Sequence, residues 1–88
     1  MLLDITRVTS PSSYLLLLRF ENNEERQIDF AEHFAFTGVF AELENPEYFK
    51  KVRLNPELGT IVWPNGADLC PDVLYELSAP VPLQASPS

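Results

Sequence analysis

The residues that most metal and redox sites require are almost missing from this chain. Its 88 residues include a single Cys, Cys70, and a single His, His33. A structural zinc site needs about four nitrogen or sulfur ligands, so such a site is excluded. One Cys cannot form an internal disulfide, which favours a reducing, cytoplasmic location. The three glycines lie far apart in the chain and form no phosphate-binding loop, so we expect no bound cofactor.

Positive charge is also scarce. The chain has 6 Lys and Arg against 13 Asp and Glu, with a net charge of -7 and a sequence pI of about 4.4. Lys and Arg supply most of the affinity for a nucleic-acid backbone, so direct nucleic-acid binding is not expected. Such acidity serves solubility, or it complements a basic partner.

Long apolar segments are missing as well. The longest apolar run, residues 14–18, is far too short to span a bilayer, and no signal peptide precedes the first strand-like run. We therefore expect a cytoplasmic protein without a membrane segment.

The chain does contain enough apolar side chain for one packed core. Hydrophobic residues make up 45% of it, including six Phe, three Tyr and one Trp. A chain of this length suits one domain, and we predict a single globular domain over residues 1–78. Residues 79–88 contain three prolines and no helical pattern, which predicts an extended or disordered tail.

The first third of the sequence predicts antiparallel strands. Residues 2–9 alternate weakly, and residues 14–21 begin apolar on both faces before they alternate. Asn22 and Asn23 tolerate a positive φ, and polar and apolar residues alternate again from residue 25 to residue 30. We therefore expect a strand followed by a β-hairpin.

The second predicted strand carries an additional apolar set, Leu15 and Leu17. If nothing else covers the sheet, these side chains remain exposed, and exposed apolar patches mark interfaces. A homodimer in which Leu15 and Leu17 meet a copy of themselves is one interpretation. A different partner, or burial under the local loop, would account for them as well.

Helical signals follow. Residues 31–38 are aromatic and irregular, which predicts a loop or one helical turn, and apolar residues then recur at helical spacing from residue 39 to residue 43. Asn45, Pro46 and Glu47 have the pattern of an N-cap, a first helical residue and an acid in the first turn.

A strand, a turn and a helix start are packed into the run from Gly59 to Tyr75. After a brief strand at residues 53–55, residues 60–63 predict another, and Trp63-Pro64-Asn65-Gly66 matches the preferences of a type I turn. Core packing is the favoured role of Trp63, since it ends an apolar strand.

The helix predicted after this turn has Cys70 or Asp68 as its cap and Pro71 in its first turn. Its predicted buried stripe is Val73, Leu74 and Leu77. The fold class that results is α+β, a small two-layer domain with an antiparallel-type sheet and the order β-β-β-α-β-β-α.

The run from Gly59 to Tyr75 resembles the signature of a bacterial family, domain of unknown function 2442. Asp29, the segment 40–43 and the helix start at residues 45–49 match the same pattern, so the resemblance covers about residues 4 to 77. It implies the fold just described. It also implies that the gene lies beside one for a small protein of another uncharacterised family, with this chain as the antitoxin-like member of the pair.

Three functions remain open at the level of sequence. The first is a non-enzymatic protein-interaction module with a small, basic protein partner, for which Trp63, Asn65, Asp68 and Tyr75 are the candidate binding edge. The second is a small-molecule or metal-dependent enzyme that uses Asp68 and Asp72. The third is the homodimer. A solvated acidic helix face is the simpler explanation of the carboxylates. His33 is more simply explained as a loop residue than as a ligand or a base.

Overall fold

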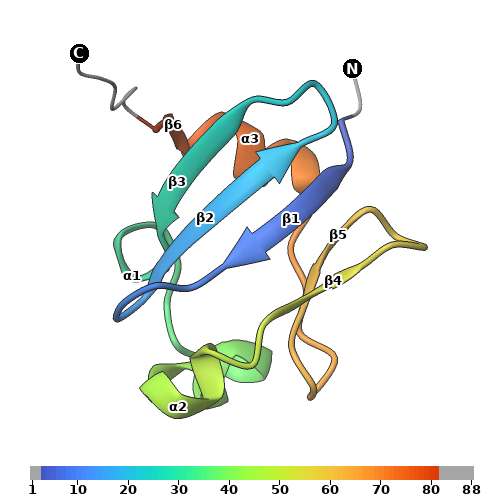
Figure 1. The fold of residues 1–88 in the computed structure, drawn as a ribbon. Helices are drawn as coiled ribbons and strands as arrows, with labels where there is room; N and C mark the ends of the chain where they lie inside the picture. Colours follow the sequence, from blue (N-terminus) through green and yellow to red (C-terminus); the bar gives the residue numbers. More distant parts are fainter. Residues whose placement is uncertain (1–2, 82–88) are drawn as a thin grey trace.

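The computed structural model describes residues 3–81 of the chain (Figure 1). In chain order the elements are β1 (Ile5–Thr9), β2 (Leu15–Phe20), β3 (Glu25–Asp29), α1 (Phe30–His33), the 3₁₀ helix η1 (Gly38–Glu44), α2 (Pro46–Phe49), β4 (Arg53–Asn55), β5 (Thr60–Val62), α3 (Pro71–Leu77) and β6 (Ala79–Pro80). The predicted α+β class and the order of the main elements are confirmed.

The larger sheet is antiparallel and has the strand order β1-β2-β3-β6. Burial alternates along β2, where Leu16, Leu18 and Phe20 are buried and the residues between them are half-buried. The predicted hairpin joins β2 to β3, and Asn23 adopts φ 70° in its turn. That left-handed conformation suits Asn, which tolerates it better than most residues.

The larger sheet extends two residues past Ser78, the predicted end of the globular domain. Ala79 and Pro80 form β6 beside β3, and the backbone N–H of Val81 donates to the carbonyl of Glu25 at 3.0 Å. Proline lacks an N–H and is therefore confined to sheet edges, which is where Pro80 lies. The remainder of the predicted tail, residues 82–88, falls outside the described residues.

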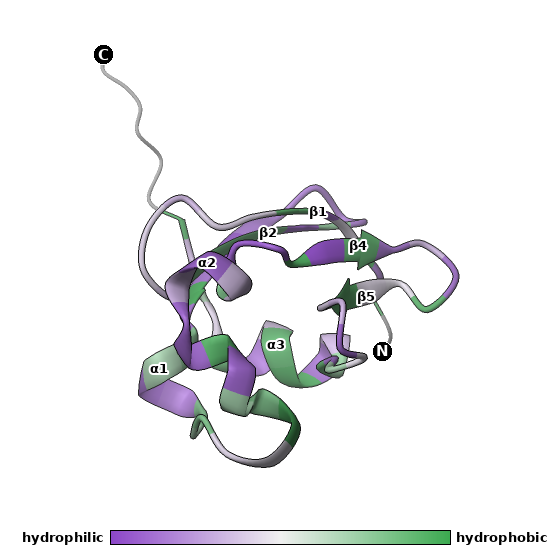
Figure 2. Cartoon of the chain, turned by 90° about the horizontal axis from the view of Figure 1, so that it is seen from below, coloured by the Kyte–Doolittle hydropathy of each residue, from purple (hydrophilic) through white to green (hydrophobic). Residues whose placement is uncertain are grey.

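The last two predicted strands form a small sheet of their own, because β4 and β5 pair with each other and not with the larger sheet. A single backbone hydrogen bond links the two sheets at this point, from the N–H of Ile5 to the carbonyl of Gly59 at 2.8 Å. In Figure 2 the helices α1, α2 and α3 all lie on one side of β1 and β2, which gives the predicted two layers.

Aromatic side chains fill the space between these layers. The ring of Phe30 lies 5.6 Å from that of Phe49 and 6.0 Å from that of Trp63, measured between ring centroids. Most of these contacts are tilted or edge-to-face, the arrangements that aromatic quadrupoles favour. The buried apolar core consists of Ile5, Leu16, Leu18, Phe20, Ile28, Phe30, Leu43, Phe49, Ile61, Trp63, Ala67, Leu69 and Leu74.

Of the short helices between β3 and β4 in the chain, α1 and α2 begin with side-chain caps. Asn45 is the predicted N-cap of α2, and its Oδ1 accepts a hydrogen bond from the N–H of Glu47 at 2.9 Å. Asp29 caps α1 in the same way through the N–H of Ala31. The helical spacing at residues 39–43 belongs to a 3₁₀ helix, η1. A 3₁₀ helix has fewer residues per turn than an α-helix.

The predicted buried stripe of α3 is wrong in two of its three positions. Leu74 is fully buried, but Val73 and Leu77 are each 40% exposed. The inward face of the helix passes through Leu74 and Ser78, which lie one turn apart and are both buried. Val73 and Leu77 each immediately precede one of these residues, so the helical rotation turns their side chains toward solvent.

Candidate functional site

Trp63 belongs to the core and not to a binding edge. Its side chain is 1% exposed, and its indole Nε1 donates a hydrogen bond to the carbonyl of Phe49 at 3.0 Å. The predicted tight turn follows it, because the N–H of Gly66 donates to the carbonyl of Trp63 at 2.9 Å. Gly66 has φ 91°, which a residue with a Cβ adopts only under strain. The favoured core role of Trp63 is confirmed.

Asn65 is exposed, but its side chain is occupied by structural contacts. Its Nδ2 donates to the carbonyl of Val39 at 3.1 Å and to Oε1 of Glu42 at 2.8 Å, while its Oδ1 accepts from the N–H of Ala67 at 3.0 Å. These bonds hold the turn closed and attach it to η1. The amide is therefore committed within the fold.

Asp68 is exposed and lies outside α3, because its backbone pairs with Val62 as an isolated β-bridge and the helix begins at Pro71. Asp68 and Asp72, the carboxylates of the enzyme alternative, therefore do not lie on one helix. Within residues 3–81, no group of three or more His, Cys, Asp and Glu side chains is arranged to hold a metal ion.

Cys70 occupies the N-cap position of α3, as predicted, but its side chain makes no capping hydrogen bond. The thiol is exposed, and no hydrogen bond joins it to His33, an exposed residue at the end of α1. Hydrogen-bond contact between the base and the nucleophile is the first requirement of a Cys–His catalytic pair, and this structure does not supply it.

Tyr75 connects α3 to the β2–β3 hairpin. Its hydroxyl donates to Oε1 of Glu24, and the guanidinium carbon of Arg26 lies 4.2 Å from the centroid of its ring. The Tyr75 hydroxyl lowers the pKa of the Glu24 carboxyl below its ordinary value, because the hydrogen bond favours the charged carboxylate. The same bond raises the pKa of Tyr75.

Arg26 completes this network from its other side. Its Nη1 lies 2.7 Å from Oε2 of Glu24, its Nε donates to Oγ of Ser78 at 2.8 Å, and its Nη2 donates to the carbonyl of Ser78 at 2.7 Å. The Arg26 side chain is only 12% exposed, so these partners offset the cost of removing its charge from water. Sequence reasoning missed the network, because its members lie about fifty positions apart.

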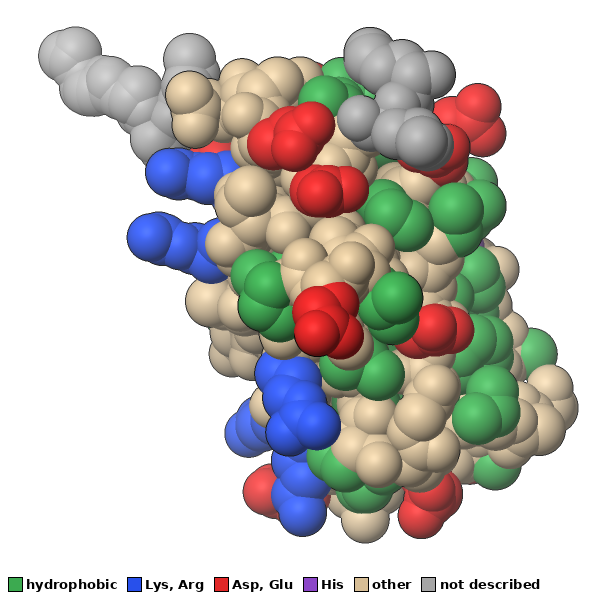
Figure 3. Space-filling model, turned by 90° about the vertical axis from the view of Figure 1, so that its right-hand side faces the viewer, with side chains coloured by type: hydrophobic (Ala, Val, Ile, Leu, Met, Phe, Trp, Pro, Cys, Tyr) green, Lys and Arg blue, Asp and Glu red, His purple; other side chains and the backbone are tan. Residues whose placement is uncertain are grey.

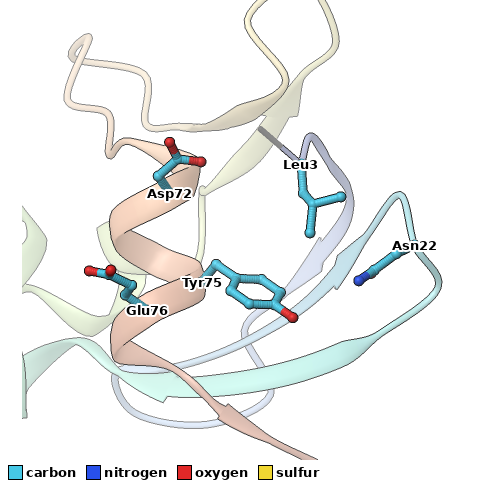
Figure 4. A pocket seen from close by; sticks show the side chains of 5 residues that line it. All are labelled: Leu3, Asn22, Asp72, Tyr75 and Glu76. Atoms are coloured by element: carbon cyan, nitrogen blue, oxygen red, sulfur yellow. The ribbon is translucent and has the colours of Figure 1, made fainter. Parts of the chain in front are cut away.

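A hollow of about 440 Å³ lies beside this network, between α3 and the N-terminal end of the described chain. We call it the α3 groove, and it is lined by Leu3, Asn22, Asp72, Tyr75 and Glu76. Figure 4 shows the Tyr75 ring pointing from the helix toward Leu3 and Asn22, with Asp72 and Glu76 on the same helix. Of the predicted binding edge, only Tyr75 lines this groove.

Within residues 3–81, the carboxylates of the α3 groove have no positively charged partner. Among the described residues, Asp72 and Glu76 make neither a salt bridge nor a side-chain hydrogen bond. Asp72 lies in the first turn of α3, where a negative charge suits the helix dipole. Beside them on the helix are the half-exposed side chains of Val73 and Leu77, so the surface is both acidic and apolar.

Leu15 and Leu17, the candidate oligomer face, lie on the face of β2 opposite its buried residues. Both are half-buried. They share that face with charged and polar residues of β1 and β3, which lie directly across from β2 in the sheet register.

Comparison with known families finds a match. Residues 5–80 match the family described as "Protein of unknown function (DUF2442)". The chain belongs to this family. The match covers every helix and strand of the structure, so the DUF2442 fold includes both the Trp63 turn and α3. Neither a curated protein nor a solved structure matches the chain. No helix in the described part of this DUF2442 chain is long and apolar enough to cross a membrane.

Proposed function

We propose that this chain is a non-enzymatic, cytoplasmic protein-interaction module that binds a small basic protein through the α3 groove. The observation that carries the proposal is the composition of the α3 surface. Asp72 and Glu76, two carboxylates without a positively charged partner in the described part of the chain, lie beside two half-exposed apolar side chains, Val73 and Leu77. Neither set contributes to the core, and together they suit a partner that is both apolar and positively charged.

Lys and Arg side chains have the chemistry that this groove accommodates. Their aliphatic stems pack on apolar surface while their charged ends stay solvated or paired. In the groove, a stem would lie between Leu3 and the ring of Tyr75, and the charged end would reach Asp72 or Glu76. Charge pairs of this kind contribute specificity and a faster association rate.

The charge distribution of the whole molecule supports a basic partner. The net charge is -7, and in the view of Figure 3 the positive side chains gather along one margin, while acids are spread over the rest. A field of this sign attracts a basic protein over roughly one Debye length, about 8 Å at physiological ionic strength. Association should therefore weaken as salt is added.

The genetic setting that the family resemblance implies suggests where the partner is encoded. A gene for a small protein beside this one would make the chain an antitoxin-like member of a pair, whose contact neutralises the neighbouring product. We propose the neighbouring product as the first partner to examine, because its isoelectric point and length can be read at once from its own sequence.

The decisive experiment is affinity purification of the tagged chain from its native host, followed by titration calorimetry with any stoichiometric basic partner at two salt concentrations. The double variant Asp72→Asn and Glu76→Gln keeps the shape of both side chains and removes their charge, and we expect it to bind at least about tenfold more weakly. Glu57→Gln, an exposed residue of the β4–β5 turn, is the matched control. Repeated recovery of the chain alone, or equal binding by the double variant and the control, would refute the proposal.

A further inference from the structure

Within residues 3–81, one face of the larger sheet has no helix on it. It is turned toward the viewer in Figure 1, and Figure 2 shows the helices grouped on the other side. We call it the open face. The register places on it Arg7 and Thr9 of β1, Leu15, Leu17 and Arg19 of β2, and Glu25, Gln27 and Asp29 of β3.

Apolar side chains occupy the middle of the open face. Leu15 and Leu17 belong to β2, which lies between β1 and β3 in the sheet. A hollow of about 200 Å³ beside Leu17 is also lined by Arg7 and Arg19. Another of about 290 Å³ beside Leu15 lies at the β3 edge of the sheet, where Leu77 of α3 also lines it. The face is therefore an apolar strip with shallow depressions and a polar border.

Charge on the open face is divided between its two sides. Arg19 and Glu25 pair across β2 and β3 at 2.5 Å, but Arg7 lies directly opposite Arg19 in the register and makes no salt bridge within residues 3–81. Like charges placed opposite each other in a sheet are destabilising. The β1 side thus carries an uncompensated positive charge, and the β3 side carries carboxylates.

We propose that the open face binds a second copy of this chain, about a two-fold axis that runs along β2. A two-fold contact is self-complementary, so each residue on the axis meets itself. Rotation about β2 places Leu15, Leu17 and Arg19 against their own copies and lays β1 over β3 of the other molecule. Arg7 then faces Glu25 of the second copy, and Thr9 faces Gln27.

The charges of the open face favour a second copy of this chain as its partner and a two-fold axis along β2. Each Arg7 meets Glu25 of the other copy, which already accepts hydrogen bonds from its own Arg19, so an Arg–Glu–Arg group forms on each side of the axis. Both groups lie in the row of Arg19, next to Leu17, where each Glu25 separates arginines of the two copies. A molecule with uniform charge would not complement the open face in this way. The separation of positive and negative sides across β2 is what makes the face fit itself.

The size of the face sets the expected strength. Three strands of five or six residues and the two-residue β6, spaced about 4.8 Å apart and rising about 3.3 Å per residue, give a surface of at most roughly 20 Å by 20 Å. Two copies would then bury about 800 Å², below the roughly 1,200 Å² at which stable interfaces begin. We therefore expect a reversible dimer that dissociates on dilution.

The test is sedimentation velocity of the full chain over a concentration series that extends to about 1 mM, where weak dimers of this size become visible. The wild type should show a sedimentation coefficient that rises with concentration. Leu17→Glu should shift the dissociation constant at least about tenfold, and Leu17→Thr, which retains a strand-forming residue, should weaken association less. A wild type that stays monomeric throughout, or a Leu17→Glu chain that associates as the wild type does, overturns the proposal.

A charge exchange tests the axis. Arg7→Glu and Glu25→Arg should each weaken association, and the double variant should recover most of it, since the exchanged charges again face each other. Lys50→Glu, an exposed position after α2, is the control for net charge. A double variant that associates no more strongly than its single variants overturns the assignment of the axis.

The α3 groove is not part of this contact, so Asp72→Asn with Glu76→Gln should leave dimerisation unchanged. Either proposal can therefore fail without the other.

Discussion

Two halves of one continuous run of sequence behave differently in this molecule. Residues 60–67, which we call the Trp63 corner, are held by a buried indole and by the amide of Asn65, whose side chain has partners within the fold on both its oxygen and its nitrogen. α3 follows a few residues later and has only Leu74 fully buried, with carboxylates and two half-exposed apolar residues on its other faces.

This contrast separates structure from function within one motif. In the Trp63 corner, unusual residues are explained by contacts inside the domain, so substitutions there should act on stability. On the outer side of α3, Asp72 and Glu76 have no ion-pair or side-chain hydrogen-bond partner within residues 3–81, and Val73 and Leu77 are each 40% exposed, so substitutions there should act mainly on binding. The same comparison predicts that the loss of stability caused by a substitution decreases from the core to the surface of α3.

Trp63→Ala should have the largest effect. Removing a buried aromatic side chain of this kind costs about 3–5 kcal/mol, a large part of the stability of a small domain. Trp63→Phe should cost less, because it keeps an aromatic ring and loses mainly the hydrogen bond to Phe49. Urea unfolding followed by circular dichroism measures both, and a cost below about 1 kcal/mol for Trp63→Ala would contradict the core role.

Asn65→Ala should come next, with a loss of about 1–2 kcal/mol, because it removes three hydrogen bonds from an exposed turn. Asn65→Asp keeps the acceptor for Ala67 but places a second carboxylate beside Glu42, so it should also destabilise. The same urea measurements apply. Full stability of Asn65→Ala would show that the tether to η1 contributes nothing.

Tyr75→Phe should give a smaller effect that depends on pH. The pKa of Glu24 in the folded chain lies below its ordinary 4.5, so the pair stabilises the fold above that pH and loses the effect as the pH falls through the lowered pKa. The pKa of Tyr75 lies above its ordinary 10.0, so its contribution is present below pH 10 and is lost as the pH rises through the raised pKa.

The measurement is the difference in unfolding free energy between the wild type and Tyr75→Phe across the pH range. It should be constant between about pH 5 and pH 9 and should shrink at both extremes. Tyr48→Phe, on α2 and outside the network, is the control. A difference that does not change below pH 4.5 would rule out the hydroxyl–carboxylate bond as its source.

Asp72→Asn with Glu76→Gln should change stability least, by less than about 0.5 kcal/mol, because neither side chain has a partner within the described chain. The loss of the favourable charge in the first turn of α3 accounts for the small decrease expected. Thermal unfolding checks this point. A loss above about 1 kcal/mol would make these acids part of the fold and would remove the contrast with the Trp63 corner.

Local features were predictable from the sequence because their causes are local. Asn23 at positive φ, Asn45 as the cap of α2 and the turn after Trp63 depend on backbone preferences and hydrogen bonds that span two to four residues. Alternation along β2 predicted both its buried face and the additional apolar set of Leu15 and Leu17. The candidate edge was predicted less well, since one of its four residues is in the core and only Tyr75 reaches the α3 groove.

The sequence by itself determined the strands, the turns, the helix starts and the acidity, since each follows from the composition and order of neighbouring residues. Only the tertiary structure decided that β6 pairs with β3, that Val73 and Leu77 face solvent, and that Glu24, Arg26 and Tyr75 meet. The physical reason is that these outcomes depend on which segments pack together. Short helices have no strong periodicity of their own, and contacts between residues about fifty positions apart leave no local pattern.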